Sequence, residues 1–225
     1  MKRLFLTIGF IGLVLVLAVA AVFALRGPVP AQTASAVPAA DSAPAPAPAP
    51  AGTDKYNFIA LPLDSSDSFV YTASGLAQYV TGTKKVVRWD AASQQYVAYT
   101  VGAPGGGFTL EVGGAYFLLL DNTANNVLSF VGNVPTQGSV SFSLTKGTSS
   151  SCKYNAISIP LDQTGIDDAS DLANAIGGIT KVVKWNATDQ QYVAYTVGAP
   201  GTPFSVSIGY PYFVCLDDTA PSNWP

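Results

Sequence analysis

The chain has 225 residues, with 11 Lys plus Arg against 14 Asp plus Glu, a formal net charge of −3 and no His. With two Cys and a single Glu, it lacks the usual ligand sets for zinc, copper, haem and iron–sulfur centres and the partners for serine–histidine or cysteine–histidine catalysis, so we expect no cofactor and no metal. A pI near 4.7 and the lack of a basic cluster larger than Lys84, Lys85 and Arg88 argue against nucleic acid as a partner.

Residues 1–26 are predicted to be a transmembrane anchor or a signal peptide. Residues 4–25 carry no charge and would span roughly 33 Å as a helix, which matches a bilayer core. Two basic residues precede this stretch and one follows it, which predicts a cytoplasmic N-terminus and an exported C-terminal region. Its length favours a retained anchor. Small-residue motifs at 22–24 and 34–36 leave secretion after cleavage open.

Residues 27–54 form a linker rich in Pro and Ala, with the run APAPAPAPA at 43–51. Alternating Pro favours polyproline II, in which residues 37–53 could extend about 50 Å at roughly 3.1 Å per residue. The linker is either a semi-rigid stalk or a disordered connector. Both interpretations predict folded structure after it.

The rest of the chain contains an internal duplication. The sequence KYNFIALPLD at 55–64 recurs as KYNAISIPLD at 153–162, and QQYVAYTVGAP at 94–104 recurs without change at 190–200. Chance similarity does not explain this agreement, so the two copies must share a fold.

We assign residues 55–150 to repeat 1 and residues 151–225 to repeat 2. Each is predicted to begin with a short apolar strand, followed by a short helix capped by Thr72 in repeat 1 and by Asp168 or Ser170 in repeat 2. A hairpin of KVVRW or KVVKW with QYVAYTV comes next. The strands FTLEV or FSVSI, and then AYFLLLD or PYFVCLD, complete about five strands per repeat.

The predicted fold is mainly β: two tandem homologous antiparallel domains of β-sandwich type, each with one short helix. Repeat 1 carries an addition at 127–144, which the turn residues PTQG at 135–138 predict to be a further hairpin. We expect this hairpin to pack against both repeats, because repeat 1 alone would otherwise expose a sheet edge.

The repeats resemble tandem β-rich modules of exported and cell-surface bacterial proteins, with the pattern N-x-I-x-L-P-L, a V-x-x-W hairpin and F-x-L-x-x-G-x-x-Y-F. The matching positions in repeat 1 are Asn57, Ile59, Pro62, Leu63, Trp89, Phe108, Gly113, Tyr116 and Phe117. Those in repeat 2 are Asn155, Ile157, Pro160, Leu161, Trp185, Phe204, Gly209, Tyr212 and Phe213. The resemblance implies a surface or envelope location and a non-catalytic role.

The aromatic residues of the two hairpins are the candidate ligand or partner surface. They are Trp89, Tyr96, Tyr99, Trp185, Tyr192 and Tyr195. Such rings could stack on sugars or bind a protein, but aromatic residues in hairpins are more often packed in a core. Strand alternation places Tyr96 and Tyr99 on opposite faces, so at most one Tyr per hairpin should face water.

Cys152 and Cys215 form a possible disulfide. Their equivalents in repeat 1 are Asp54 and Leu119, so the shared fold does not require them. Cysteines commonly pair outside the cytoplasm, and antiparallel pairing of the first and last strands of repeat 2 would bring these two together. The bridge would contribute about 4 kcal/mol in the chain-entropy model. Two independent thiols are the alternative.

Aspartates before the helices could in principle hold calcium. They are Asp64, Asp67, Asp162, Asp167, Asp168 and Asp171. The positions shared by both repeats could serve a glycosidase. They are Asp64 with Asp162 and Asp121 with Asp217. No spacing matches a calcium loop, and turn and capping chemistry accounts for these residues, so we predict neither a metal site nor an enzyme.

We therefore predict a membrane-tethered, extracytoplasmic protein that acts through binding surfaces in a structural or adhesive role. Its partner would be an envelope protein or a polysaccharide. A carbohydrate-binding module for wall or extracellular polysaccharide is one alternative. An accessory subunit of a membrane complex or of a surface filament is the other.

Overall fold

The computed structural model describes residues 54–66, 68–121 and 127–225. The predicted leader and most of the linker, residues 1–53, lie outside the described residues. Among the described residues, no helix has the length and apolar character needed to cross a membrane.

Each repeat forms a four-stranded antiparallel sheet and one short helix, so the protein is mainly β. Repeat 1 contains β1 (Lys55–Ala60), α1 (Ala73–Tyr79), β2 (Thr83–Asp90), β3 (Gln95–Thr100) and β4 (Ala115–Leu120). Repeat 2 contains β6 (Lys153–Ser158), α2 (Ala169–Ile176), β7 (Ile179–Asn186), β8 (Gln191–Thr196) and β9 (Pro211–Leu216). The strand orders are β1-β4-β2-β3 and β6-β9-β7-β8, so the two repeats share one topology.

The expected fifth strand of each repeat, FTLEV or FSVSI, does not join a sheet. In repeat 1 it runs beside the start of α1, where Ala73 N–H donates to Phe108 O at 2.9 Å and Leu110 N–H donates to Tyr71 O at 3.0 Å. The alternation of apolar and polar residues in FTLEV has another cause. Phe108 and Leu110 pack against the cluster under the helix, while the intervening Thr109 is exposed. Extended chain over a helix end thus produces the same pattern as a strand.

Both helices begin at the predicted capping residues. Thr72 accepts the N–H of Gly75 through its side chain, and Asp168, rather than Ser170, caps α2. Asp171 completes a capping box with Asp168, which satisfies the first free N–H groups of that helix. One face of each helix packs on its sheet, with Leu76 of α1 and Leu172 of α2 fully buried.

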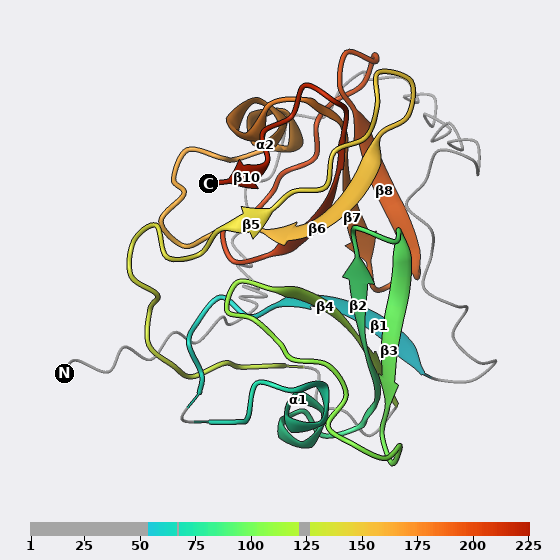
Figure 1. Ribbon diagram of the computed structural model, residues 1–225, viewed down its shortest axis with the longest axis vertical. Helices are drawn as coiled ribbons and strands as arrows, with labels where there is room; N and C mark the ends of the chain where they lie inside the picture. Colours follow the sequence, from blue (N-terminus) through green and yellow to red (C-terminus); the bar gives the residue numbers. More distant parts are fainter. Residues whose placement is uncertain (1–53, 67, 122–126) are drawn as a thin grey trace, which may run out of the picture.

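The four layers run α1, sheet, sheet, α2, and the two sheets face each other (Figure 1). Strand alternation gives each sheet two apolar faces, as β2 illustrates: Val86 belongs to the cluster under α1, whereas Val87 belongs to a cluster shared with repeat 2. Sandwich packing therefore occurs between the repeats and not within either one.

The connecting segment 127–144 is not the hairpin that we expected. Its first part packs Leu128 and Phe130 against the repeat 1 cluster, whereas Leu144 is buried in the repeat 2 cluster. Because the two arms serve different cores, they diverge instead of pairing. Its end forms β5 (Phe142–Ser143), which pairs with β10 (Asn223–Trp224) at the C-terminus. The segment contacts both repeats, as predicted, but it joins neither four-stranded sheet, so the edge argument for that contact was wrong.

Candidate functional site

The two sheets meet in a group of buried side chains that we call the central cluster. Its buried members are Tyr56, Val87, Trp89, Phe117 and Leu119 from repeat 1, and Tyr154, Val183, Phe213 and Cys215 from repeat 2. Six rings stack or meet edge to face around Phe117, which lies 4.3 Å from Phe58 and 5.4 Å from Trp185 between ring centroids. Aromatic contacts of this kind join the repeats through a buried interior.

Two tryptophans cross the interface in equivalent ways. The Trp89 indole N–H donates to Tyr154 O at 2.8 Å, and the Trp185 indole N–H donates to Tyr56 O at 2.9 Å. Each tryptophan thus comes from the hairpin of one repeat and binds the first strand of the other. This reciprocity is the signature of a two-fold related, self-complementary interface, here formed within one chain.

Two glutamines complete the same arrangement. Gln94 accepts the N–H of Tyr154 at 2.9 Å and donates to Tyr154 O at 2.9 Å. Gln190 pairs with Tyr56 in the same way, at 2.8 and 2.9 Å. The side-chain amide therefore takes the place of a neighbouring strand's peptide group. It covers part of the outer edges of β1 and β6, which would otherwise present free backbone groups.

The backbone of both glutamines is held in the left-handed region, with φ of 56° at Gln94 and 55° at Gln190. A non-glycine residue rarely adopts this conformation. The amide nitrogen offsets the cost because it also donates to its own turn, from Gln94 to Ala91 O and from Gln190 to Ala187 O, at 2.6 Å each. The sequence analysis missed these two residues, although the unchanged QQ at the end of each hairpin turn was the available signal.

Tyr96 and Tyr192 meet where the two hairpins approach each other, with their hydroxyl oxygens 2.6 Å apart. Burial raises the pKa of both hydroxyls well above the ordinary tyrosine value. Both groups therefore stay protonated at neutral pH, and their mutual hydrogen bond satisfies them inside the interface.

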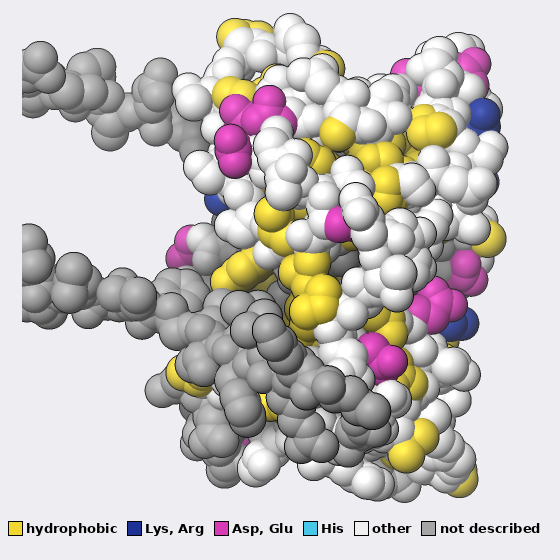
Figure 2. Space-filling model, turned by 90° about the vertical axis from the view of Figure 1, so that its left-hand side faces the viewer, with side chains coloured by type: hydrophobic (Ala, Val, Ile, Leu, Met, Phe, Trp, Pro, Cys, Tyr) yellow, Lys and Arg dark blue, Asp and Glu magenta, His cyan; other side chains and the backbone are white. Residues whose placement is uncertain are grey.

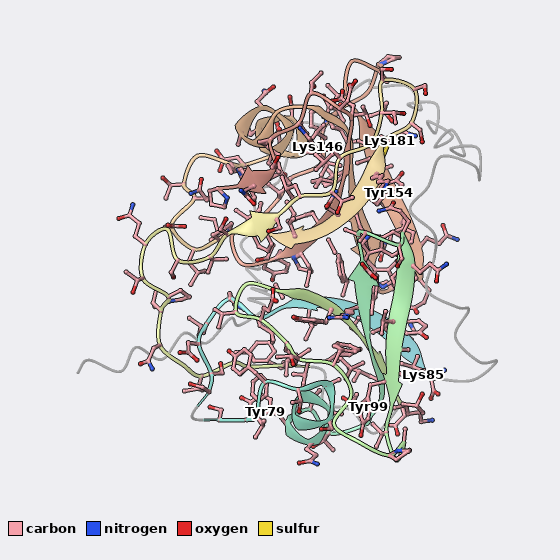
Figure 3. The ribbon with its side chains drawn as sticks, viewed as in Figure 1. Tyr79, Lys85, Tyr99, Lys146, Tyr154 and Lys181 are labelled. Carbon is pink, nitrogen blue, oxygen red and sulfur yellow. A yellow bond between two sulfur atoms is a disulfide. The ribbon has the colours of Figure 1, made fainter. Side chains whose placement is uncertain are left out.

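The six candidate aromatic residues therefore have two locations, neither of which is an open platform. Trp89 is buried, and Trp185, Tyr96 and Tyr192 pack against the central cluster. Tyr99 and Tyr195 lie on the opposite faces, where they pack against the clusters under α1 and α2; Figure 3 shows Tyr99 beside α1. Strand alternation places Tyr96 and Tyr99 on opposite faces of the sheet, as predicted. The face that we expected to be exposed to water is instead covered by the other repeat.

Cys152 and Cys215 form a disulfide, with Cα atoms 5.4 Å apart and a sequence separation of 63 positions. It lies at the margin of the central cluster, where Cys215 is fully buried. In repeat 1 the residue equivalent to Cys152 is Asp54, which forms an ion pair instead: Lys84 Nζ lies 2.9 Å from its carboxylate. Different cross-links thus fasten the start of the first strand in the two repeats.

The aspartates serve turns and caps. Asp168 and Asp171 form the helix cap, and Asp64 and Asp217 each accept a backbone N–H two residues further on. Within the described ranges, no three His, Cys, Asp or Glu side chains are placed to hold a metal ion. Asp67 lies outside the described residues.

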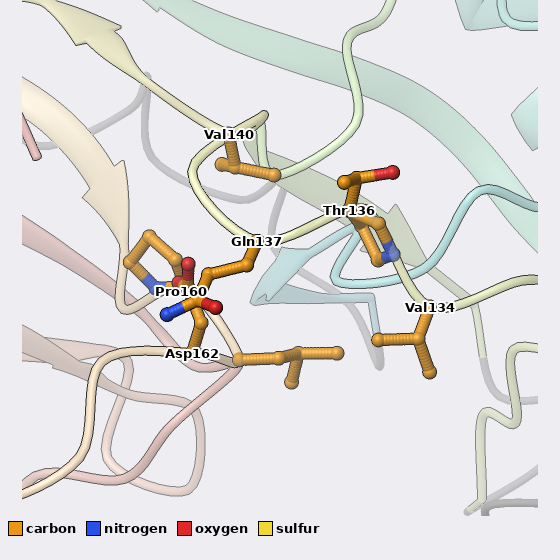
Figure 4. Close-up of a pocket in the computed structure, with 8 residues that line it drawn as sticks. Val134, Thr136, Gln137, Val140, Pro160 and Asp162 are labelled. Atoms are coloured by element: carbon orange, nitrogen blue, oxygen red, sulfur yellow. The ribbon is translucent and has the colours of Figure 1, made fainter.

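A surface hollow of about 360 Å³ lies where residues 134–140 meet residues 160–162 (Figure 4). Its lining is mostly apolar, and Asp162 already accepts the N–H of Gly138 at 2.8 Å. We assign it to the seam between the connecting segment and repeat 2. On the same face, hydrophobic side chains gather near the middle with acidic side chains scattered around them (Figure 2).

A comparison with known protein families found no model that matches the chain. Comparisons with curated proteins and with solved structures also found no match. The resemblance to surface repeat modules therefore stays a prediction.

We expect Gln94→Ala to lower the free energy of unfolding by about 1–3 kcal/mol, because the change removes the side-chain amide that bonds to both the N–H and the O of Tyr154. Chemical denaturation of the full chain, followed by tryptophan fluorescence, measures this loss. The matched control is Gln95→Ala: the neighbouring glutamine is exposed, and its loss should change stability by less than about 0.5 kcal/mol. Equal effects of the two variants would contradict the role given to Gln94.

Proposed function

We propose that this chain is an exported, membrane-tethered protein whose two repeats form one rigid body that acts through binding surfaces in a structural or adhesive role. The observation that carries the proposal is the Cys152–Cys215 disulfide, because such bonds persist mainly outside the cytoplasm. The charge-free stretch at 4–25 and the linker at 27–54 support a tether.

The central cluster supports a structural role over a chemical one. Four of the six candidate rings are engaged between the repeats, and Tyr99 and Tyr195 pack under the helices. Trp89, Gln94 and their equivalents direct their polar groups into the interface between the repeats. An interior of this kind holds two modules in a fixed orientation. The outer surfaces are then available for a partner. Because the candidate rings are packed inside the protein, this arrangement favours a protein partner over the carbohydrate-binding alternative.

The test is the intact mass of the protein, taken without reductant from separated membrane and medium fractions of cells that produce it. We expect a full-length mass in the membrane fraction, about two mass units below that of the reduced protein because disulfide formation removes two hydrogens. A Cys152→Ala, Cys215→Ala double variant is the control, whose mass reduction should leave unchanged. A chain beginning near residue 25 or 37 in the medium would contradict the tether.

A further inference from the structure

The two outer strands of each sheet have different surroundings. The outer edges of β1 and β6 meet the other repeat through Gln190 and Gln94. The outer strands at the opposite sides, β3 and β8, pair only with β2 and β7 in the described part of the chain. The two repeats therefore cover part of one edge of each sheet, and no strand among the described residues pairs with the other edge.

Hydrogen-bond alternation shows which groups face outward along β3. Val101 N–H donates to Lys84 O at 2.9 Å, so the β3 residues that bond to β2 are alternate ones counted back from Val101. The intervening residues, Tyr96, Ala98 and Thr100, direct their backbone N–H groups to the open edge. Val197 bonds to Thr180 O in the same way in repeat 2. The outward residues of β8 are Tyr192, Ala194 and Thr196.

Neither open edge carries the features that usually prevent strand pairing. The sequence QYVAYT of both strands contains no charge and no Pro, and neither strand has an irregularity in its pairing with the sheet. Ala98 is exposed, whereas Ala194 is half-buried and packs against the central cluster. The valines around these strands are exposed: Val101 by 49%, Val193 by 39% and Val197 by 43%. An uncharged, partly apolar edge of this kind is a template for another strand.

The two open edges have the same sequence, and this indicates what binds to them. The unchanged run at 94–104 and 190–200 extends beyond the residues that contact the other repeat, and includes the exposed Val101. When two such strands pair antiparallel, Ala lies opposite Ala, and Tyr opposite Thr on either side, so every outward N–H meets an outward C=O. Each edge thus complements another copy of itself, and it is continuous with the meeting point of Tyr96 and Tyr192.

We propose that β3 and β8 are docking edges for a second copy of this chain, joined by antiparallel strand pairing centred on Ala98 and Ala194. The inference rests on the proposed function, because it names the partner of the proposed binding surface. Each chain has two such edges, so the assembly continues from copy to copy.

The first test compares two double variants of the full chain in mild detergent by sedimentation. Ala98→Lys with Ala194→Lys places like charges opposite each other at every joint, whereas Thr136→Lys with Ser149→Lys adds the same charge at exposed sites away from the edges. We expect the native chain and the control to form species larger than a monomer, and the edge variant to be monomeric while its near-UV spectrum stays that of a folded chain. A monomeric native chain, or an edge variant that associates as the native chain does, would overturn the proposal.

The second test does not depend on how well the repeats tolerate Lys. Ala98→Cys with Ala194→Cys should give a ladder of dimers and larger species on oxidation, which reductant removes, because opposed strand residues lie within disulfide reach. Thr136→Cys with Ser149→Cys should give no ladder, and equal cross-linking of both variants would refute the edge pairing.

Fractionation of the same cells separates the two proposals. A full-length membrane chain without cross-links would refute the edge pairing and leave the tether intact. A shortened chain in the medium that still forms the ladder would refute the tether and retain the edge pairing.

Discussion

Replacing Phe117 by Ala is expected to lower the free energy of unfolding of the whole double module by about 3–5 kcal/mol. Phe117 is 1% exposed, and its ring contacts Phe58 of its own repeat and Trp185 of the other. The substitution therefore removes packing from both halves at once, and the rigid strands around it cannot close the cavity. Denaturation of the full chain, followed by near-UV circular dichroism, measures the loss.

The control for this prediction is Phe108→Ala, which removes a ring of the same size from the outer side of repeat 1. Phe108 is only half-buried and packs against Tyr116 and the guanidinium of Arg88, 5.0 Å from the ring centroid. Its loss should cost about 1–2 kcal/mol. If both variants lose the same free energy, the central cluster is not the main joint between the repeats.

Removing the disulfide should cost about 2–5 kcal/mol of stability. The bridge closes a loop between residues 63 positions apart, and its loss enlarges the unfolded ensemble of repeat 2 while leaving that of repeat 1 unchanged. Cys152→Ala with Cys215→Ala is the variant, and its denaturation midpoint should fall below that of the native chain.

Reductant provides the matched control for the disulfide. Native protein in reductant should approach the stability of the double variant, and the double variant should be indifferent to reductant. A native chain whose stability is the same with and without reductant would contradict a stabilising bridge.

Local features of the fold were predictable from the sequence, because they depend on near neighbours. Thr72 and Asp168 cap the helices as capping rules require, and the two hairpins pair as the matched apolar runs predict. The pairing of the cysteines was predictable although they lie 63 positions apart, because both belong to repeat 2 and its first and last strands, β6 and β9, pair antiparallel.

Features that depend on both repeats were not predictable. Nothing in one repeat shows that the inner face of its sheet, including Trp89 and Phe117, is covered by the other repeat. The role of Gln94 was missed for the same reason, because its hydrogen-bond partner Tyr154 belongs to the other repeat, 60 residues away in sequence. Segment 127–144 was predicted to be a hairpin from its turn residues, which are a local signal. Its two arms instead pack against the separate cores of the two repeats, which the segment alone does not show.

The pairing of the two repeats does not depend on protein concentration, because both repeats belong to one chain. Two separate copies of one repeat would meet at a rate that depends on their concentration, but the connecting segment makes their joining unimolecular. The paired state then does not weaken as the protein becomes scarce. It also allows the halves to differ, since each always meets the other and never itself. The disulfide in one half and the Asp54–Lys84 ion pair in the other illustrate that freedom.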